Sequence, residues 1–169
     1  MTLNNSDIHT SSSDGGRITP GERRRCRDIM TMDIQTVSRE ANLQVAAKLM
    51  RDGDMGALPV VDETRKLVGI ITDRDIVVRA AAEERDLRQT MVAEVMTREV
   101  HTARPDDFVF QAIRLMGDKQ VRRIPVVEAD GRLAGILSMA DIALETEDER
   151  EIAEALEDIS SGSAFWRKS

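Results

Sequence analysis

The sequence predicts a mixed α/β (α+β) fold in which two β-α-β-β-α repeats pack about a pseudo-twofold axis. Three observations predict it. Residues 28–78 and 94–144 are the same 51-residue unit, offset by 66 positions without a gap, and 15 of the 51 pairs are identical. Each copy alternates β-branched runs with segments of helical periodicity. A single unit of this kind is too small to bury its apolar face, so the two copies should pack on each other.

The chain divides into four parts. Residues 1–22 are polar and are expected to form a disordered tail. The repeats occupy 23–83 and 90–145, and 146–169 would form a C-terminal helix and tail. The apolar stripe of that helix, which ends near Ile159, should pack on its own domain or on a dimer partner.

Each repeat is expected to open with a short extended segment, at residues 34–37 or 100–103, followed by a helix. Apolar residues at a spacing of 3.6 predict the helices. The first helix should end near Gly53. The second has Asp106 or Asp107 as its expected N-cap.

Two strands and a second helix should complete each repeat. The first strand, 57–61 or 123–127, contains a proline, which is typical of an edge strand or of the first residue of a strand. A polar turn leads to the second strand, and the next helix should begin after a hydroxyl residue. These second strands and N-caps are 67–71 with Thr72 and 133–137 with Ser138.

Composition argues against several classes of protein. The net charge of −7 disfavours non-specific nucleic-acid binding, and three Phe, one Trp and no Tyr offer few stacking faces. No apolar run approaches the ~20 residues of a membrane helix. The first 16 residues lack the apolar segment of a secretory signal. We therefore expect a cytoplasmic protein that binds neither nucleic acid nor membrane.

Residues for catalysis or metal binding are scarce. The chain has two histidines, His9 and His101, and one cysteine, Cys26, so a His/Cys metal site within one subunit is not expected. It has no glycine-rich phosphate loop, and no nucleophile has a plausible base. We expect no enzyme activity. The arginines around Cys26 could lower its pKa, but a lone thiol at a tail junction is usually inert. The run 23–27 is either an anion or partner contact or a solvated stretch.

The strongest local signal lies where the last strand of each repeat meets its last helix. Residues 69–75 and 135–141 both fit Gly-x-x-Thr/Ser-x-x-Asp. The carboxylate can accept hydrogen bonds from the vicinal hydroxyls of a ribose, and helix amides favour an anion or polar group. The same spacing is also a helix capping box. Its recurrence in identical register is what makes the signal strong.

At residues 28–145 the chain resembles the cystathionine-β-synthase (CBS) domain family, as a stand-alone CBS pair, or Bateman module. The phrases that carry the resemblance are Gly-Ala-Leu-Pro-Val-Val (56–61), Thr-Asp-Arg-Asp-Ile (72–76) and Val-Arg-Arg-Ile-Pro-Val-Val (121–127). The chain is similar to small bacterial pairs of the hypoxic-response and stress-response type. The resemblance implies two clefts, each lined by both repeats, for AMP, ADP, ATP or S-adenosylmethionine, and no other cofactor.

In the first cleft the resemblance implies a ribose held by the end of the last strand and its helix, and phosphates held by arginines. The base would rest on the start of the first repeat and on residues 55–57. The implied residues are Ser138 and Asp141 for ribose, Arg122 and Arg123 for phosphate, and Met30, Gln35, Met55, Gly56 and Ala57 for the base.

The second cleft exchanges the roles of the repeats. Its implied residues are Thr72 and Asp75 for ribose, and Met96, His101 and Val121 around the base. Its phosphate positions, Gly56 and Ala57, carry no charge. The Asp141 cleft is therefore expected to bind a phosphate-bearing ligand more tightly. The Asp75 cleft is expected either to be empty or to suit a less charged adenosyl compound.

The resemblance implies a regulatory homodimer, associated through its helices, that signals ligand occupancy to an unknown effector protein in trans. The alternative is a ligand-free structural or interaction module whose two aspartates only cap helices. Arg122 and Arg123 would then pair with acidic surface neighbours. Arg74 is expected to be exposed or at an interface. An unrecognised enzyme that turns over a bound nucleotide is the remaining class.

Overall fold

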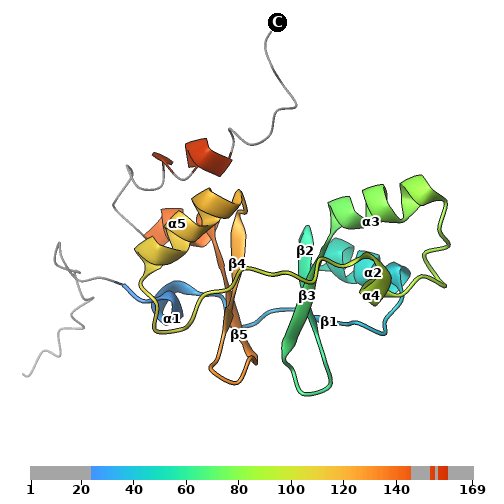
Figure 1. Cartoon of the computed structure of the whole chain (residues 1–169), viewed down its shortest axis with the longest axis horizontal. Helices are drawn as coiled ribbons and strands as arrows, with labels where there is room; N and C mark the ends of the chain where they lie inside the picture. Colours follow the sequence, from blue (N-terminus) through green and yellow to red (C-terminus); the bar gives the residue numbers. More distant parts are fainter. Residues whose placement is uncertain (1–23, 146–152, 155, 160–169) are drawn as a thin grey trace, which may run out of the picture.

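The structure is a computed structural model that describes residues 24–145, 153–154 and 156–159. Figure 1 shows two hairpins side by side at the centre, with helices on their outer sides. The first half of the chain contains α1 (Cys26–Ile29), β1 (Val37–Ser38), α2 (Leu43–Asp52), β2 (Ala57–Val61), β3 (Leu67–Thr72), α3 (Asp73–Arg79) and a 3-10 turn (Ala81–Glu83). The second contains α4 (Val92–Val95), α5 (Val109–Lys119), β4 (Arg123–Val127), β5 (Leu133–Ser138) and α6 (Met139–Glu145).

The hairpins have the predicted strands in the same register in both repeats. β2 pairs antiparallel with β3, and β4 pairs antiparallel with β5. The extended segment before the first helix is shorter than predicted: β1 is two residues long and runs parallel to β2. In the second repeat it is a single parallel bridge from Ala103 to Val126, which matches the Val37–Val60 pair of the first.

The expectation for the prolines was wrong in the first repeat. Pro59 is the third residue of β2, the central strand of the sheet β1-β2-β3. The second repeat shows why a proline fits here. The N–H of Ala103 donates to the carbonyl of Pro125, and the N–H of Val127 donates to Ala103. This parallel bridge needs the proline's carbonyl but not an N–H from it, so the ring costs no ladder hydrogen bond.

Three of the four predicted helix ends are confirmed. α2 ends at Gly53, α3 begins after Thr72, and α6 begins after Ser138. The predicted N-cap of α5 was wrong, because the cap is Phe108. The Asp107 carboxylate instead accepts the N–H of Arg104 at 2.7 Å, which closes the turn before the helix.

The short helices α1 and α4 pack on the opposite repeats. Cys26 and Ile29 of α1 are buried in the core of the second repeat, and α1 contacts β5 and α6. Val92 and Val95 of α4 are buried in the core of the first repeat, and α4 contacts α3. In Figure 1 the blue α1 therefore lies beside the orange β5, while α4 lies among the helices of the first repeat.

Backbone hydrogen bonds repeat this exchange. Thr31 and Ile136 donate to each other's carbonyls at 2.9 Å, and Thr97 and Ile70 do the same at 2.9 Å. Adding 66 to Thr31 gives Thr97, and subtracting 66 from Ile136 gives Ile70. The pseudo-twofold axis therefore relates the hydrogen bonds between the two repeats as well as their sequences.

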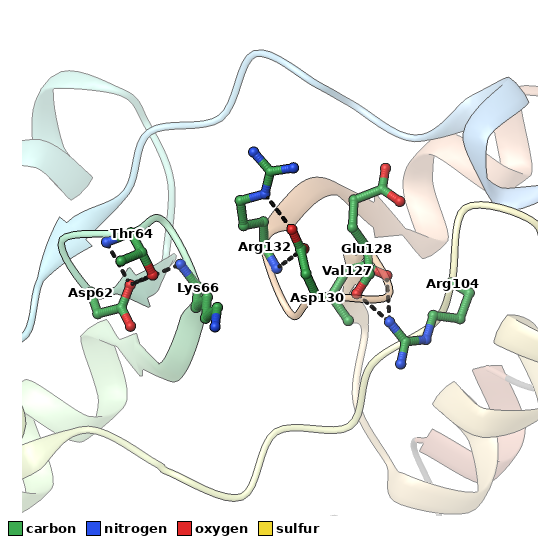
Figure 2. A network of polar contacts seen from close by, with 8 residues as sticks. All are labelled: Asp62, Thr64, Lys66, Arg104, Val127, Glu128, Asp130 and Arg132. Atoms are coloured by element: carbon green, nitrogen blue, oxygen red, sulfur yellow. Dashed lines mark hydrogen bonds and ion pairs between the residues drawn. The ribbon is translucent and has the colours of Figure 1, made fainter.

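The two hairpin turns meet at this axis. Lys66 and its equivalent Arg132 form an antiparallel bridge, flanked by the Leu67 N–H to Gly131 carbonyl and Leu133 N–H to Arg65 carbonyl bonds, both 3.1 Å. Figure 2 shows how each turn is held: Asp62 accepts from Thr64 and Lys66, and Asp130 accepts from Arg132.

The prediction for the C-terminal helix is tested only in part. Residues 153–154 and 156–159 are helical, and Ile159 is buried in the core of the second repeat. Leu156 is 43% exposed. Residues 146–152, 155 and 160–169, like the predicted tail at 1–22, lie outside the described residues.

Candidate ligand sites

Ser138 and Asp141 form the centre of the first predicted site. Oδ2 of Asp141 accepts hydrogen bonds from Ser138 N at 3.0 Å and Ser138 Oγ at 2.6 Å. The N–H of Asp141 donates to Ser138 Oγ at 3.2 Å. The pair is half-buried at the junction of β5 and α6. The geometry is that of a capping box, and it leaves Oδ1 of the carboxylate as an acceptor for a ligand hydroxyl.

Thr72 and Asp75 have the same geometry at the junction of β3 and α3. Oδ2 of Asp75 accepts from Thr72 N at 3.0 Å and Thr72 Oγ1 at 2.8 Å, and Asp75 N donates to Thr72 Oγ1 at 3.1 Å. Both repeats therefore place a carboxylate where the motif predicts it. Capping uses only Oδ2 of each aspartate, so the geometry of the motif is compatible with both of its interpretations.

The predicted phosphate positions lie beside these pairs. The carbonyl of Arg122 accepts the N–H of Met139 at 3.0 Å, and Arg123 pairs with Ser138 across the hairpin. Both arginines are exposed. The first repeat has the uncharged Gly56 and Ala57 at the equivalent places: Gly56 accepts from Asp73 at 3.0 Å and Ala57 pairs with Thr72. The local charge of the two sites therefore differs.

The resemblance also implies that Gly56 and Ala57 contact the adenine base at the Asp141 site. Their described contacts are with Thr72 and Asp73, in the first repeat. That position fits their role as phosphate positions of the Asp75 site. Their assignment to the base of the Asp141 site stays a prediction.

Met30 and Met96 lie in the segments that cross to the opposite repeats. A Cβ placed on Gly135 would lie 2.7 Å from Met30 Sδ, and one on Gly69 would lie 2.8 Å from Met96 Sδ. Each methionine therefore packs on the strand that leads to one of the aspartates. Met30 therefore lies on the strand that leads to Asp141 and Met96 on the strand that leads to Asp75, and the contact of either with a ligand stays a prediction.

The other residues predicted to contact the adenine base have their described contacts within their own repeats. Gln35 and Met55 both approach Gly53 in the first repeat, and Gln35 is exposed. Their equivalents are the exposed His101 and the half-buried Val121, which packs on the second core. No described contact joins these four residues to either aspartate, so their contact with a ligand stays a prediction.

Sequence reasoning missed Arg79. Its Nη1 lies 3.4 Å from Asp75 Oδ1 and donates to the carbonyl of Val95 at 2.9 Å. The available signal was the i, i+4 spacing of Asp75 and Arg79 on one helix, which places the two charges side by side. Arg74 is exposed, as expected.

The basic run near the N-terminus makes contacts within the domain. Arg27 forms a 2.5 Å ion pair with Asp106, and Arg25 lies 4.7 Å from the centre of the Phe108 ring and donates to the carbonyl of Asp106. The suggestion of a lowered Cys26 pKa was wrong. Burial, helped by the nearby Asp107 carboxylate, raises the pKa of this thiol from 9.0 to about 11.

Among the described residues, no group of three His, Cys, Asp or Glu side chains is arranged to hold a metal ion. Within the same part of the chain, no helix has the length and apolar character needed to cross a membrane.

Comparison with known proteins identifies two copies of one family. The CBS domain matches residues 26–81 and 92–148. The CBS domain-containing protein YhcV of Bacillus subtilis is 39% identical over 134 residues, covering 79% of this chain and 94% of that protein. Hypoxic response protein 1 of Mycobacterium tuberculosis is 35% identical over 117 residues, covering 69% of this chain and 81% of that protein.

Solved structures agree with these matches. Hypoxic Response Protein I with two coordinated zinc ions has a TM-score of 0.68 at 33% identity, covering 73% of this chain and 99% of that chain. The CBS pair of MJ0100 with 5'-methylthioadenosine and S-adenosylmethionine has a TM-score of 0.65 at 32% identity, covering 73% and 95%. CBSX2 in complex with AMP has a TM-score of 0.64 at 28% identity, covering 72% and 94%.

Proposed function

This chain belongs to the CBS domain family as a tandem pair, and we propose that it is a regulatory module that binds an adenosyl ligand at the Asp141 and Asp75 sites. The observation that carries the proposal is the repeated junction of a hydroxyl–carboxylate pair with a methionine from the opposite repeat. The AMP complex of CBSX2 and the S-adenosylmethionine complex of MJ0100 support the class of ligand.

The Asp141 site is the better candidate for AMP, ADP or ATP. Arg122 and Arg123 are exposed next to Ser138, where they are available to pair with phosphate oxygens. Gly56 and Ala57 offer no charge beside Thr72. The Asp75 site would suit a less charged adenosyl compound, such as S-adenosylmethionine.

A ligand at the Asp141 site would act by a population shift. Ser138 and Asp141 belong to the second repeat, whereas Met30 belongs to the segment that leads into the first. A ligand that contacts all three favours the arrangement in which both repeats reach it. The output would pass to an effector protein in trans, through a homodimer in the cytoplasm.

Thermal unfolding with AMP, ADP, ATP, S-adenosylmethionine and NADH tests the proposal. A ligand at a hundred times its dissociation constant adds about 2.7 kcal/mol to the unfolding free energy and raises Tm by several degrees. Asp141→Ala should abolish the shift that AMP, ADP or ATP causes. Asp75→Ala is the matched control, because it removes the same capping interaction from the other repeat. No shift with any ligand in folded protein would contradict the proposal.

A second candidate, an interaction module, is favoured by exposed apolar residues at equivalent positions. Val78 of α3 is 53% exposed and Leu144 of α6 is 85% exposed; Val77, beside Val78, is 60% exposed. Apolar side chains grouped on helix faces favour association with a partner or a second copy. The replacement of Val78 and Leu144 by serine should then give a monomer in light scattering. An unchanged oligomeric state would contradict a role for these helices.

The proposed module is not an enzyme. Inosine-5'-monophosphate dehydrogenase of Methanocaldococcus jannaschii, a relative that is an enzyme, is matched over 23% of its own length. The matched part is therefore a minor part of that chain. ATP that stays intact during long incubation with this protein would support the proposal, and its turnover would overturn it.

A further inference from the structure

Arg79, the last residue of α3, contacts the carboxylate of the Asp75 site. Its Nη1 is 3.4 Å from Oδ1 of Asp75, while Oδ2 accepts the two hydrogen bonds from Thr72. The Asp75 side chain is 13% exposed and that of Arg79 is 50% exposed. Both carboxylate oxygens therefore have partners inside the protein.

The same guanidinium reaches the segment that crosses from the other repeat. Nη1 donates to the carbonyl of Val95 at 2.9 Å and to Thr97 Oγ1 at 3.3 Å. These two residues flank Met96, which packs on Gly69. Arg79 thus joins the carboxylate to the segment that carries the predicted base contact.

Among the described residues of the second repeat, no Lys or Arg side chain contacts Asp141. Its residue equivalent to Arg79 is Glu145. Oδ2 of Asp141 is held by Ser138 in the same way as Oδ2 of Asp75 is held by Thr72. Among the described residues, no side chain or backbone group donates to Oδ1 of Asp141. The two aspartates have the same capping geometry but differ in the availability of their second oxygen.

We propose that the ion pair of Arg79 with Asp75 weakens ribose binding at the Asp75 site, so that an adenosyl ligand occupies the Asp141 site first. The inference rests on the proposed function, because it concerns the same two carboxylates. A ribose hydroxyl is a neutral donor, and at Asp75 it must displace or share a charge-assisted contact. The half-exposed pair can lower affinity by up to about fivefold.

The test removes Arg79 from protein whose Asp141 site has been disabled. Adenosine is the probe, because it carries the ribose without phosphate charge, and its Kd is measured by calorimetry. Asp141→Ala is compared with Asp141→Ala plus Arg79→Gln. The control is Asp141→Ala plus Arg74→Gln, which removes one positive charge from an exposed position of the same helix.

The double variant Asp141→Ala plus Arg79→Gln should bind adenosine up to about fivefold more tightly than Asp141→Ala alone. The control, Asp141→Ala plus Arg74→Gln, should bind adenosine no more tightly than Asp141→Ala. Adding Asp75→Ala to the variant with Asp141→Ala and Arg79→Gln should abolish this gain in affinity for adenosine. A purely structural role for Arg79 predicts a lower Tm and no gain in affinity. Unchanged, weaker or absent adenosine binding in the Arg79→Gln variant overturns the inference.

The wild-type protein separates the two possible failures. If it binds adenosine, and Asp141→Ala weakens that binding without any gain from Arg79→Gln, the inference fails and the proposed function stands. If the wild type binds neither adenosine, AMP nor S-adenosylmethionine, the proposed function fails and the inference fails with it.

Discussion

Thr31 and Ile136 exchange two backbone hydrogen bonds of 2.9 Å, which place the start of the first repeat on β5 of the second. The equivalent residues, Thr97 and Ile70, place the start of the second repeat on β3 of the first. Each repeat supplies a segment that completes the other. Separation of the two halves would therefore expose buried groups in both.

Truncation of a crossing helix should destabilise the opposite repeat. Ile29→Ala removes a side chain that is 9% exposed in the second core, and Val95→Ala removes its equivalent in the first core. Each change should cost about 2–3 kcal/mol of unfolding free energy. Hydrogen exchange should rise in β5 and α6 for Ile29→Ala, and in α2 and β3 for Val95→Ala.

The exposed Val78 is the control for these truncations, because Val78→Ala removes little buried area. If Ile29→Ala speeds hydrogen exchange only in the first repeat, α1 does not stabilise the second repeat as the structure indicates.

A methyl group at Gly135 should disturb the contact with the crossing segment. The Cβ of Gly135→Ala would lie 2.7 Å from Met30 Sδ and 2.9 Å from the carbonyl oxygen of Thr31. The sulfur can move, but the backbone oxygen is held in its bond to Ile136, so we expect a loss of about 1–3 kcal/mol in urea unfolding.

Gly56→Ala is the control for this change. Its nearest atom is Oδ2 of the exposed Asp73 side chain, at 3.1 Å, which can move at little cost. If Gly135→Ala is as stable as Gly56→Ala, the close approach of the crossing segment to β5 is not maintained in solution.

The hairpins could be predicted from the sequence because β-branched runs, turns and hydroxyl caps agree at the same positions in both copies. The cores on which α1 and α4 pack could not be predicted from the sequence. Both helices have four residues, too few for a periodicity, and the repeat shows which positions are equivalent but not which core each one joins. The N-cap of α5 was missed because Asp107 uses its carboxylate in the preceding turn.

The candidate sites could be predicted to a similar extent. The positions of Asp75 and Asp141 follow from the motif, since a strand end and a helix start fix them relative to Thr72 and Ser138. The contact of Arg79 with Val95 could not be predicted, because it depends on α4 packing against α3 from the other repeat.

The Cys26 thiol should be unreactive in the native protein. Its pKa, raised by burial from 9.0 to about 11, leaves almost no thiolate at pH 8. Iodoacetamide at pH 8 should modify Cys26 slowly in native protein and rapidly in urea. Rapid modification of the native state would show that α1 is not docked on the second repeat.

The same pKa predicts a stability change in alkali. The native state holds the thiol proton more tightly than the unfolded chain, so this contribution to stability is constant below pH 9 and is lost as the pH rises from about 9 to 11. Cys26→Ala should remove that part of the alkaline loss. An identical alkaline profile in the variant would contradict the raised pKa.

The carboxylates in the two hairpin turns, Asp62 and Asp130, should stabilise the native protein at neutral pH and lose this contribution in acid. The hydrogen bond from the Thr64 side chain lowers the pKa of Asp62 below 3.8, and the backbone N–H of Arg132 lowers that of Asp130. Their contribution is present above pH 3.8 and is lost as the pH falls through the lowered values. Asp62→Asn with Asp130→Asn should flatten the acid limb of the stability profile.

Glu63→Gln is the control for the acid limb, since Glu63 is an exposed carboxylate in the same turn. Equal flattening by Glu63→Gln would attribute the effect to net charge rather than to the turn hydrogen bonds.

The most direct test of ligand binding is a titration of protein labelled with ¹³C at its methionine methyl groups, followed by NMR with AMP. Met30 and Met96 report separately on the Asp141 and Asp75 sites, and Met30→Leu and Met96→Leu assign their signals. We predict that AMP moves the Met30 signal first, and that Asp141→Ala abolishes this movement. A spectrum that AMP leaves unchanged, or a movement of Met96 alone, would contradict an adenosyl-binding site at Asp141.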